Sequence, residues 1–176
     1  DAVSILRDRV IPGRDEPVFG NPASVNMLIA THAVVFDVTD GVIWVSASPH
    51  QLGQFVPFGF DEFEAPKGKA IIASDPILDN GGYKRFTDSV ALIEEAEGLF
   101  ASKKYDQAMD RCADAEKLNT GDYRVFLLKA QIAVKQKNWD VAREASAVAQ
   151  GLYVAYGHEQ QELDELIETV NRHTKG

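Results

Sequence analysis

The chain has 176 residues, of which 45% are apolar and 26% are charged, and its net charge at pH 7 is −9. This composition is typical of one average globular domain or two small ones, and it excludes wholesale disorder. Both halves are acidic, with 7 basic and 11 acidic residues before Phe86 and 11 basic and 16 acidic residues from it onward. Because neither half has a basic stripe to neutralise phosphates, we expect no nucleic-acid partner.

No apolar run approaches the ~20 residues that a membrane helix requires, so we expect no membrane span. The N-terminus lacks the basic and apolar regions of a signal peptide. The only cysteine, Cys112, has no partner for an internal disulfide, which leaves the redox compartment open. Since Asp1 is not an initiator Met and begins inside a helix-like pattern, we expect the chain to be a piece of a longer polypeptide.

The first 85 residues read as β-rich with irregular connections. Residues 1–11 carry apolar side chains at helical spacing until Pro12-Gly13, and residues 13–22 form a turn-rich loop. Residues 54–60 predict a short strand that Pro57 places at an edge or bulge. Residues 62–83 read as a connector in which residues 70–73 add to a sheet edge.

The clearest local signal is a β-hairpin. Residues 31–39 and 42–48 are rich in β-branched and aromatic side chains, and Asp40-Gly41 between them favours a two-residue type I′ turn. The predicted register pairs residues 39 with 42, 36 with 45 and 34 with 47. One face is then apolar throughout, consisting of Val34, Phe36, Val38, Ile43, Val45 and Ala47. The other is mixed, consisting of Val35, Asp37, Thr39, Val42, Trp44 and Ser46.

Residues 86–176 are helical and contain an internal repeat. Shifting the sequence against itself so that Ala96 falls on Ala130 also places Tyr105 on Trp139, Ala108 on Ala142 and Ala115 on Ala149. The period of about 34 residues, with small residues at helix crossings and an aromatic residue opening the second helix, resembles the tetratricopeptide repeat. Glu95, Lys129 and Thr120 depart from that repeat, and a final helix over 159–172 is predicted to cap the module. The predicted class is α+β, with a boundary between residues 85 and 86.

The β-rich half also resembles a known family. The string from Asn21 to Phe60, preceded by Ser4 to Arg9 (SILRDR), is similar to the C-terminal part of the acyl-coenzyme A:6-aminopenicillanic acid acyltransferase family. These proteins are cysteine N-terminal-nucleophile hydrolases related to choloylglycine hydrolases. The marks are the LRDR helix end, the Asn-Pro turn, Thr31-His32 before a strand, and the run from Val42 to Ser46 on its partner.

The resemblance implies an αββα sandwich that cleaves itself to free an N-terminal cysteine, which attacks an amide or thioester with its own α-amino group as base. In this sequence that cysteine would lie upstream of Asp1, so the resemblance gives this chain no catalytic residue. It would instead complete the sandwich, alongside an upstream segment or chain of the same precursor. Relatives are often bacterial, and the choice between cytoplasm and periplasm stays open.

Several residues are candidates for binding. His32, at a strand start, and Trp44, on the mixed hairpin face, are candidates for the substrate pocket, although packing roles are the simpler reading of both. On the repeats, Arg124, Lys129 and Gln136 are candidates for binding a peptide or protein partner, although with only two repeats an intramolecular buttress is the simpler reading. Cys112 reads as a small core residue.

No metal or cofactor is expected. His50, His158 and His173 have no Cys or His at ligand spacing, and the acidic cluster Asp61, Glu62 and Glu64 lacks the pattern of a calcium loop. Two functions from different classes therefore remain open. One is the C-terminal portion of a self-processing cysteine amidohydrolase or acyltransferase with a helical docking module. The other is a non-catalytic tetratricopeptide-like interaction module.

Overall fold

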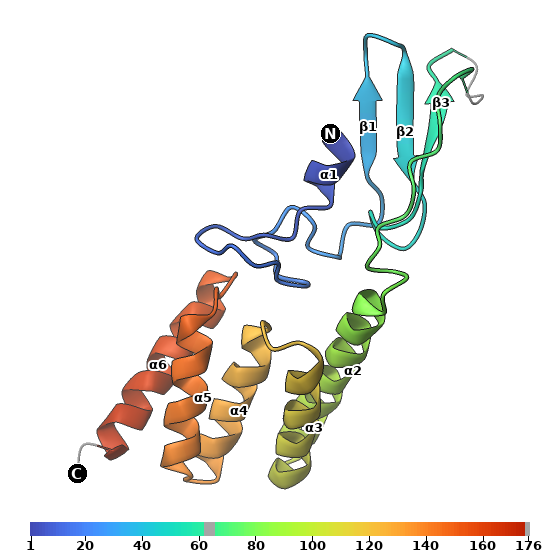
Figure 1. Cartoon of the computed structure of the whole chain (residues 1–176). Coiled ribbons are helices and arrows are strands. Elements are labelled where there is room, and N and C mark those ends of the chain that lie inside the picture. The colour runs from blue at the N-terminus through green and yellow to red at the C-terminus, as the bar shows by residue number, and fades with distance from the viewer. Residues whose placement is uncertain (62–65, 175–176) are drawn as a thin grey trace. The chain divides into compact units, whose positions relative to one another are not determined.

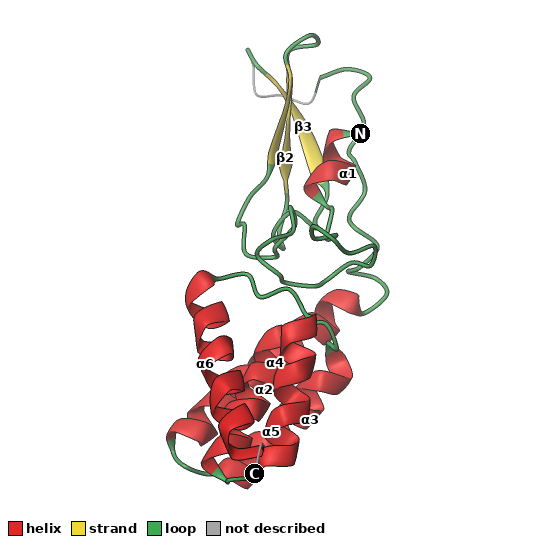
Figure 2. Cartoon of the chain, turned by 90° about the vertical axis from the view of Figure 1, so that its left-hand side faces the viewer, coloured by secondary structure: helices red, strands yellow, loops and turns green. Residues whose placement is uncertain are grey.

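The computed structural model describes residues 1–61 and 66–174. It divides into two compact units, unit 1 over residues 1–84 and unit 2 over residues 85–176. Unit 1 contains all the strands of the described residues, and most of the helical residues belong to unit 2 (Figure 2). The expected α+β class is confirmed at this level.

In unit 1, residues 1–61 and 66–84 form one short helix and an antiparallel sheet. The helix is α1 (Ala2–Leu6), and the strands are β1 (Val34–Asp37), β2 (Val42–Ser46) and β3 (Phe55–Gly59). The strand order is β1-β2-β3, so β1 and β3 form the two edges (Figure 1). The expected strand over 54–60 is confirmed as β3, which contains Pro57 at the sheet edge.

Helix α1 is shorter than the sequence pattern predicts. It opens with a capping box in which the Asp1 carboxylate accepts from the Ser4 backbone N–H at 2.9 Å. It ends at Leu6 rather than near Pro12. The Asp8 carboxylate accepts from the Val10 backbone N–H, which turns the chain out of the helix before the proline.

The predicted hairpin register is wrong by two residues. Val34 pairs with Val45, and Asp37 pairs with Val42, so a four-residue turn replaces the two-residue turn. The Asp37 side chain accepts from the backbone N–H groups of Thr39 and Asp40, both at 3.1 Å, and thereby stabilises the longer turn. Only Gly41 in this turn has a positive φ, of 64°, which excludes type I′.

The division of side chains between the two faces survives, because a shift of two residues preserves the alternation. We call the apolar side of the sheet the open face. Its members are Val34, Phe36, Ile43, Val45, Val56 and Phe58. Val34 is 42% exposed and Phe36 is 63% exposed, and Val38 and Phe60 extend the exposed apolar surface beyond the strand ends.

The opposite side, the covered face, carries the core of unit 1. Val3 and Leu6 of α1 pack there against Val35, Trp44 and Phe55. Figures 1 and 2 show α1 on this one side of the sheet, near β1. The expected edge segment over 70–73 is also confirmed, because Ile72 exchanges two backbone hydrogen bonds of 3.0 Å with Phe55. The mixed face, rather than the apolar one, is therefore the buried side of this sheet.

Unit 2 is built from helices that run up and down in sequence (Figure 1). They are α2 (Gly82–Ala101), α3 (Tyr105–Leu118), α4 (Tyr123–Lys135), α5 (Trp139–Gly151) and α6 (Gly157–Thr174). α4 packs against both α3 and α5, and α6 packs mainly against α5. The expected final helix is confirmed as α6, with slightly wider bounds.

The internal repeat is visible in the backbone. Lys103 and Lys137, which occupy equivalent positions in the two copies, both have left-handed φ angles, of 60° and 58°. Each follows a helix that ends with the same bond, from the Lys104 N–H to the Leu99 carbonyl in one copy and from the Asn138 N–H to the Ala133 carbonyl in the other. This is the Schellman arrangement, in which a left-handed residue lets the last carbonyls find donors.

The predicted small residues lie at the helix crossings. Each matched alanine pair is fully buried in both copies, and the members are Ala96, Ala130, Ala108, Ala142, Ala115 and Ala149. Because an alanine side chain is one methyl group, helix backbones approach closely at these points. Larger side chains then fill the space between crossings, including Ile93, Val125 and Leu163.

Candidate functional sites

A groove runs beside β1 in unit 1 and has a volume of about 550 Å³. We call it the β1 groove. Its walls come from α1, β1, Trp44 and Ile72, with the lining residues Asp1, Ala2, Val3, Val35, Phe36, Asp37, Val38, Thr39, Trp44 and Ile72. Consecutive residues from 35 to 39 line it, and successive side chains of a strand point to opposite faces. The groove therefore runs along β1 and extends over the covered face to Trp44 and Ile72.

Trp44 lies in this groove. Its ring is half-buried on the covered face, and the Lys69 ammonium is 5.5 Å from the ring centre. Lys69 also forms ion pairs with Asp37 and Asp40, and the hydrogen bond to Asp40 raises the pKa of Lys69. Trp44 therefore both packs against the core of unit 1 and lines the groove.

His32 is not among the residues that line the β1 groove. It is exposed and precedes β1 rather than opening it. His50 is more constrained, because its Nδ1 lies 3.3 Å from the Ala30 carbonyl oxygen and its ring contacts Tyr83 edge-on. The structure does not bring His32 and Trp44 together around the groove.

Two arginines in the LRDR segment organise the base of the sheet. Arg7 donates from Nη2 to the carbonyls of Gly53 at 2.8 Å and Ala73 at 2.9 Å, and from Nε to the carbonyl of Gln51 at 3.3 Å. Its guanidinium lies 5.4 Å from the Phe55 ring centre. Burial lowers the pKa of Arg7, with Asp75 opposing this effect. We call this set of contacts the Arg7 clamp.

Arg9 makes the second tie. Its Nη1 donates to the Asp75 carboxylate at 2.8 Å, and the Asp75 side chain is 5% exposed. The other oxygen of Asp75 accepts from the Ile77 backbone N–H. The structural role of this segment was not predicted from the sequence, in which it stood out only by its family resemblance. The available signal was a pair of arginines at the end of a helix with no acidic residue at helical spacing.

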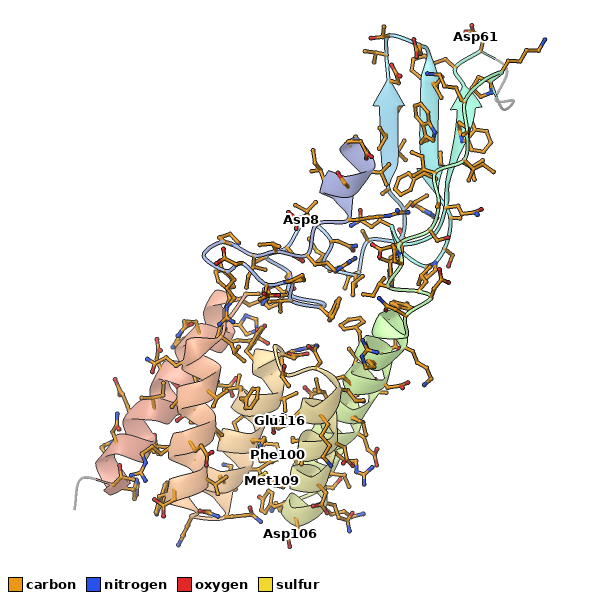
Figure 3. The ribbon with its side chains drawn as sticks, in the orientation of Figure 1. Asp8, Asp61, Phe100, Asp106, Met109 and Glu116 are labelled. Carbon is orange, nitrogen blue, oxygen red and sulfur yellow. The ribbon has the colours of Figure 1, made fainter. Side chains whose placement is uncertain are left out.

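Unit 2 has a second groove, of about 350 Å³, which we call the α4–α6 groove. It is lined by Phe100, Gln131, Val134, Lys135, Glu162, Glu165, Leu166 and Thr169. Phe100, Val134 and Leu166 supply the apolar surface and are half-buried. Figure 3 shows the labelled Phe100 near the same end of unit 2 as Met109 and Asp106.

The charges of the α4–α6 groove lie on different walls. Glu162 and Glu165 come from α6, and Lys135 comes from α4. Gln131 on α4 donates to Glu162 at 2.8 Å, which ties the two walls together at one point. These residues were not predicted from the sequence. The five acidic residues within α6 were the signal that could have drawn attention to this helix.

The predicted partner-binding residues have partners within the chain. Arg124 forms two side-chain hydrogen bonds to Asp122, of 2.9 and 2.6 Å, which raise its pKa. Lys129 donates to Glu116 on α3 at 2.7 Å. Gln136 donates to Asp106 on α3 at 2.6 Å. Lys129 and Gln136 thus fasten α4 and its end to α3, and none of the three predicted residues lines the α4–α6 groove.

Cys112 is fully buried in the core of unit 2. Burial raises the pKa of its thiol from 9.0 to about 12, so the thiolate is scarce at neutral pH. Within residues 1–61 and 66–174, no group of His, Cys, Asp and Glu side chains could hold a metal ion. Of the acidic cluster, Glu62 and Glu64 lie outside the described residues. None of the described helices is long and apolar enough to cross a membrane.

Comparison with known proteins adds no relative. No family model matches the sequence, no curated protein matches it, and no solved structure matches its fold.

Proposed function

We propose that unit 1 is part of a layered αββα sandwich belonging to a self-processing cysteine amidohydrolase or acyltransferase, and that unit 2 is its helical docking module. The acyl substrate would be an amide or a thioester. The chain would complete the sandwich, and the nucleophile would come from another segment or chain of the same precursor. The buried Cys112 is unsuited to that role, because it is internal and protonated at neutral pH.

The open face of the sheet carries this proposal. One side of the sheet is covered by α1, while the other is apolar and exposed at Val34 and Phe36. A contiguous apolar face of this kind normally marks a surface that another element covers. In a sandwich, each sheet has helices on one side and a second sheet about 10 Å away on the other. Unit 1 supplies the helix and one sheet of such a stack.

The edge of the sheet gives separate support. Among the described residues, β1 pairs only with β2, so the backbone groups on its outer edge have no strand partner. Exposed edges invite pairing with a further strand. A sheet that is open both at β1 and on its apolar face is what remains when neighbouring strands and a second sheet belong to another segment.

Intact-mass analysis tests the proposal. The protein is purified from its natural source through a C-terminal tag on the gene and treated with a thiol-reactive label. We expect a second polypeptide that begins with cysteine and takes up the label at that residue. Recovery of one uncleaved product, or of this chain alone as a stable monomer, would overturn the enzyme proposal.

Two matched variants locate the contact. Phe36→Ser on the open face should reduce the amount of the second polypeptide that co-purifies. Ile5→Ser on α1 should leave it unchanged, although Ile5 is as exposed as Phe36, at 64% against 63%. Equal losses in both variants would argue against the open face as the contact.

The second candidate is a non-catalytic tetratricopeptide-like interaction module, and the α4–α6 groove favours it. The groove combines an apolar floor with charged walls in the part of the chain where the internal repeat lies. Its volume falls within the range of about 300–1,000 Å³ that is common for ligand sites. In this function the chain binds a partner through unit 2 and needs no nucleophile.

A further inference from the structure

The α4–α6 groove differs chemically along its two sides. The α6 side presents the carboxylates of Glu162 and Glu165, and both residues are exposed. The floor is formed by half-buried apolar side chains from three helices, namely Phe100 of α2, Val134 of α4 and Leu166 of α6. A ligand that fits both features must bring apolar side chains and positive charge to the same place.

The helix behind the acidic wall strengthens this requirement. α6 contains five acidic residues, and its one Lys or Arg side chain, that of Arg172, lies in its last turn. The acidic field along α6 is therefore not neutralised over most of its length. Fields of one sign raise the rate at which oppositely charged partners arrive and discourage partners of the same sign.

The lysine on the opposite wall orients the ligand. Lys135 lies in the last turn of α4, and within the described residues its ammonium has no hydrogen bond or ion pair. The ammonium can donate a hydrogen bond to a carbonyl or carboxylate group of the ligand on the side away from α6. The ligand is thus expected to carry its positive charges on one side only.

We propose that the α4–α6 groove binds a peptide segment of a partner protein that is amphipathic and basic, with apolar side chains entering between Val134 and Leu166 and Lys or Arg side chains facing Glu162 and Glu165. The proposal rests on the docking role proposed for unit 2. It adds the chemistry of the partner and the residues that select it. Charge complementarity decides between this occupant and an acidic or purely apolar one.

Three fluorescein-labelled twelve-residue peptides test the proposal with the full chain. They share one spacing of leucines and carry Lys, Glu or Gln at the flanking positions, and binding is followed by fluorescence anisotropy. We expect the Lys peptide to bind about tenfold more tightly than the Gln peptide and the Glu peptide to bind most weakly. Raising the salt concentration from about 0.05 to 0.5 M should remove most of this preference.

A matched pair of charge reversals tests the site. Glu165→Lys should invert the order of the Lys and Glu peptides. Asp164→Lys should leave that order unchanged, because Asp164 does not line the groove. The two acidic residues are otherwise alike: each is exposed on α6 and accepts a 2.9 Å hydrogen bond from the glutamine four residues earlier. Circular dichroism melts should show both variants folded.

The outcomes distinguish the specificity for basic peptides from the docking role of unit 2. Equal binding of the three peptides, or equal effects of the two reversals, would overturn the basic-peptide specificity and leave docking through unit 2 intact. Absence of binding by all three peptides would overturn both. Tighter binding of the Glu peptide would assign the opposite partner chemistry and refute this one.

Discussion

Units 1 and 2 are stabilised by different kinds of interaction. In unit 2, short helices repeat the same alanine crossings and the same left-handed helix end, and its core contains aliphatic side chains from successive helices. In unit 1, a small core under α1 is supplemented by the Arg7 clamp and the Arg9–Asp75 pair, which join residues 44 to 66 positions apart. Unit 2 buries its apolar helix faces within the chain, whereas the sheet of unit 1 leaves its apolar face exposed.

This comparison indicates where each unit is sensitive to change. A unit that relies on repeated local packing responds to side-chain volume and helix-end geometry. A unit held by a few polar ties between distant segments responds to loss of a single charged group. The chain has two tryptophans, Trp44 in unit 1 and Trp139 in unit 2, so each unit carries its own fluorescence reporter.

The largest effect is expected from Arg9→Met. This substitution leaves the nearly buried Asp75 carboxylate without its cationic partner. We expect the free energy of unfolding reported by Trp44, in a Trp139→Phe background, to fall by about 3 kcal/mol. Urea unfolding followed by fluorescence measures this change.

The control for this variant is Arg143→Met. Arg143 pairs with Asp140 on the surface, where the side chains are 58% and 87% exposed. Pairs of this kind contribute little, so the Trp139 signal should change by less than about 0.5 kcal/mol. If Arg9→Met and Arg143→Met had equal effects, the contrast between the units would be lost.

An intermediate effect is expected from Cys112 at alkaline pH. Its folded pKa is raised from 9.0 to about 12, so above pH 9 the unfolded thiol loses its proton while the folded thiol keeps it. Stability from this group is therefore complete below pH 9 and is lost as the pH rises toward 12. By pH 10 the loss is about 1.4 kcal/mol.

Cys112→Ala removes this ionisation from unit 2. Urea unfolding with Trp139 as reporter measures the unfolding free energy of the variant and of the parent at pH 8 and pH 10. Between these two pH values, the free energy of the variant should fall by about 1.4 kcal/mol less than that of the parent. The packing loss in the variant is the same at both pH values and cancels in this difference. Parallel curves for the two proteins would show that the thiol does not titrate as its burial requires.

The smallest effect is expected from Lys137→Gly. Lys137 has a φ of 58°, a conformation that costs a residue with a Cβ atom about 1 kcal/mol and costs glycine little. We expect a gain of about 0.5–1 kcal/mol in the unfolding free energy of unit 2, and Lys103→Gly should give the same gain at the equivalent position. Ala147→Gly, at an exposed site inside α5, should instead lose about 1 kcal/mol. A loss in all three variants would contradict the proposed role of the helix ends.

The sequence predicted unit 2 better than unit 1 because the signals of unit 2 are local. The matched alanines and the aromatic residues Tyr105 and Trp139 are read directly by shifting the sequence against itself, and α3 and α5 begin at those aromatics. The α4–α6 groove escaped prediction because it depends on how far two helices diverge. Periodicity tells which side chains share a helix face and does not give the distance between helices.

The hairpin shows both what a pattern can predict and where it fails. Alternation assigned the two faces correctly, because it is a property of each strand. The register depended on the turn, where the Asp40-Gly41 signal was outweighed by the Asp37 carboxylate and its two backbone donors. The Arg7 contacts were beyond reach, since an arginine that binds backbone carbonyls leaves no complementary residue type in the sequence. The Arg9–Asp75 pair was beyond reach for another reason, because its members lie 66 positions apart and the sequence offers many other acidic residues as partners.

The Arg7 clamp also has a consequence for how the sequence can vary among homologues. Because its three acceptors are main-chain carbonyls, the clamp depends on the path of the chain and not on the side chains at its anchor points. The residue at position 73 can therefore be substituted without loss of the hydrogen bond to Arg7. Gly53 is fixed for a separate reason, since a Cβ atom there would lie 2.2 Å from the Ala47 carbonyl oxygen. Among homologues, we would then expect an invariant arginine at position 7 and a variable residue at position 73. Methods that detect paired substitutions would not find this contact, because the arginine binds the main chain of residue 73 and not its side chain.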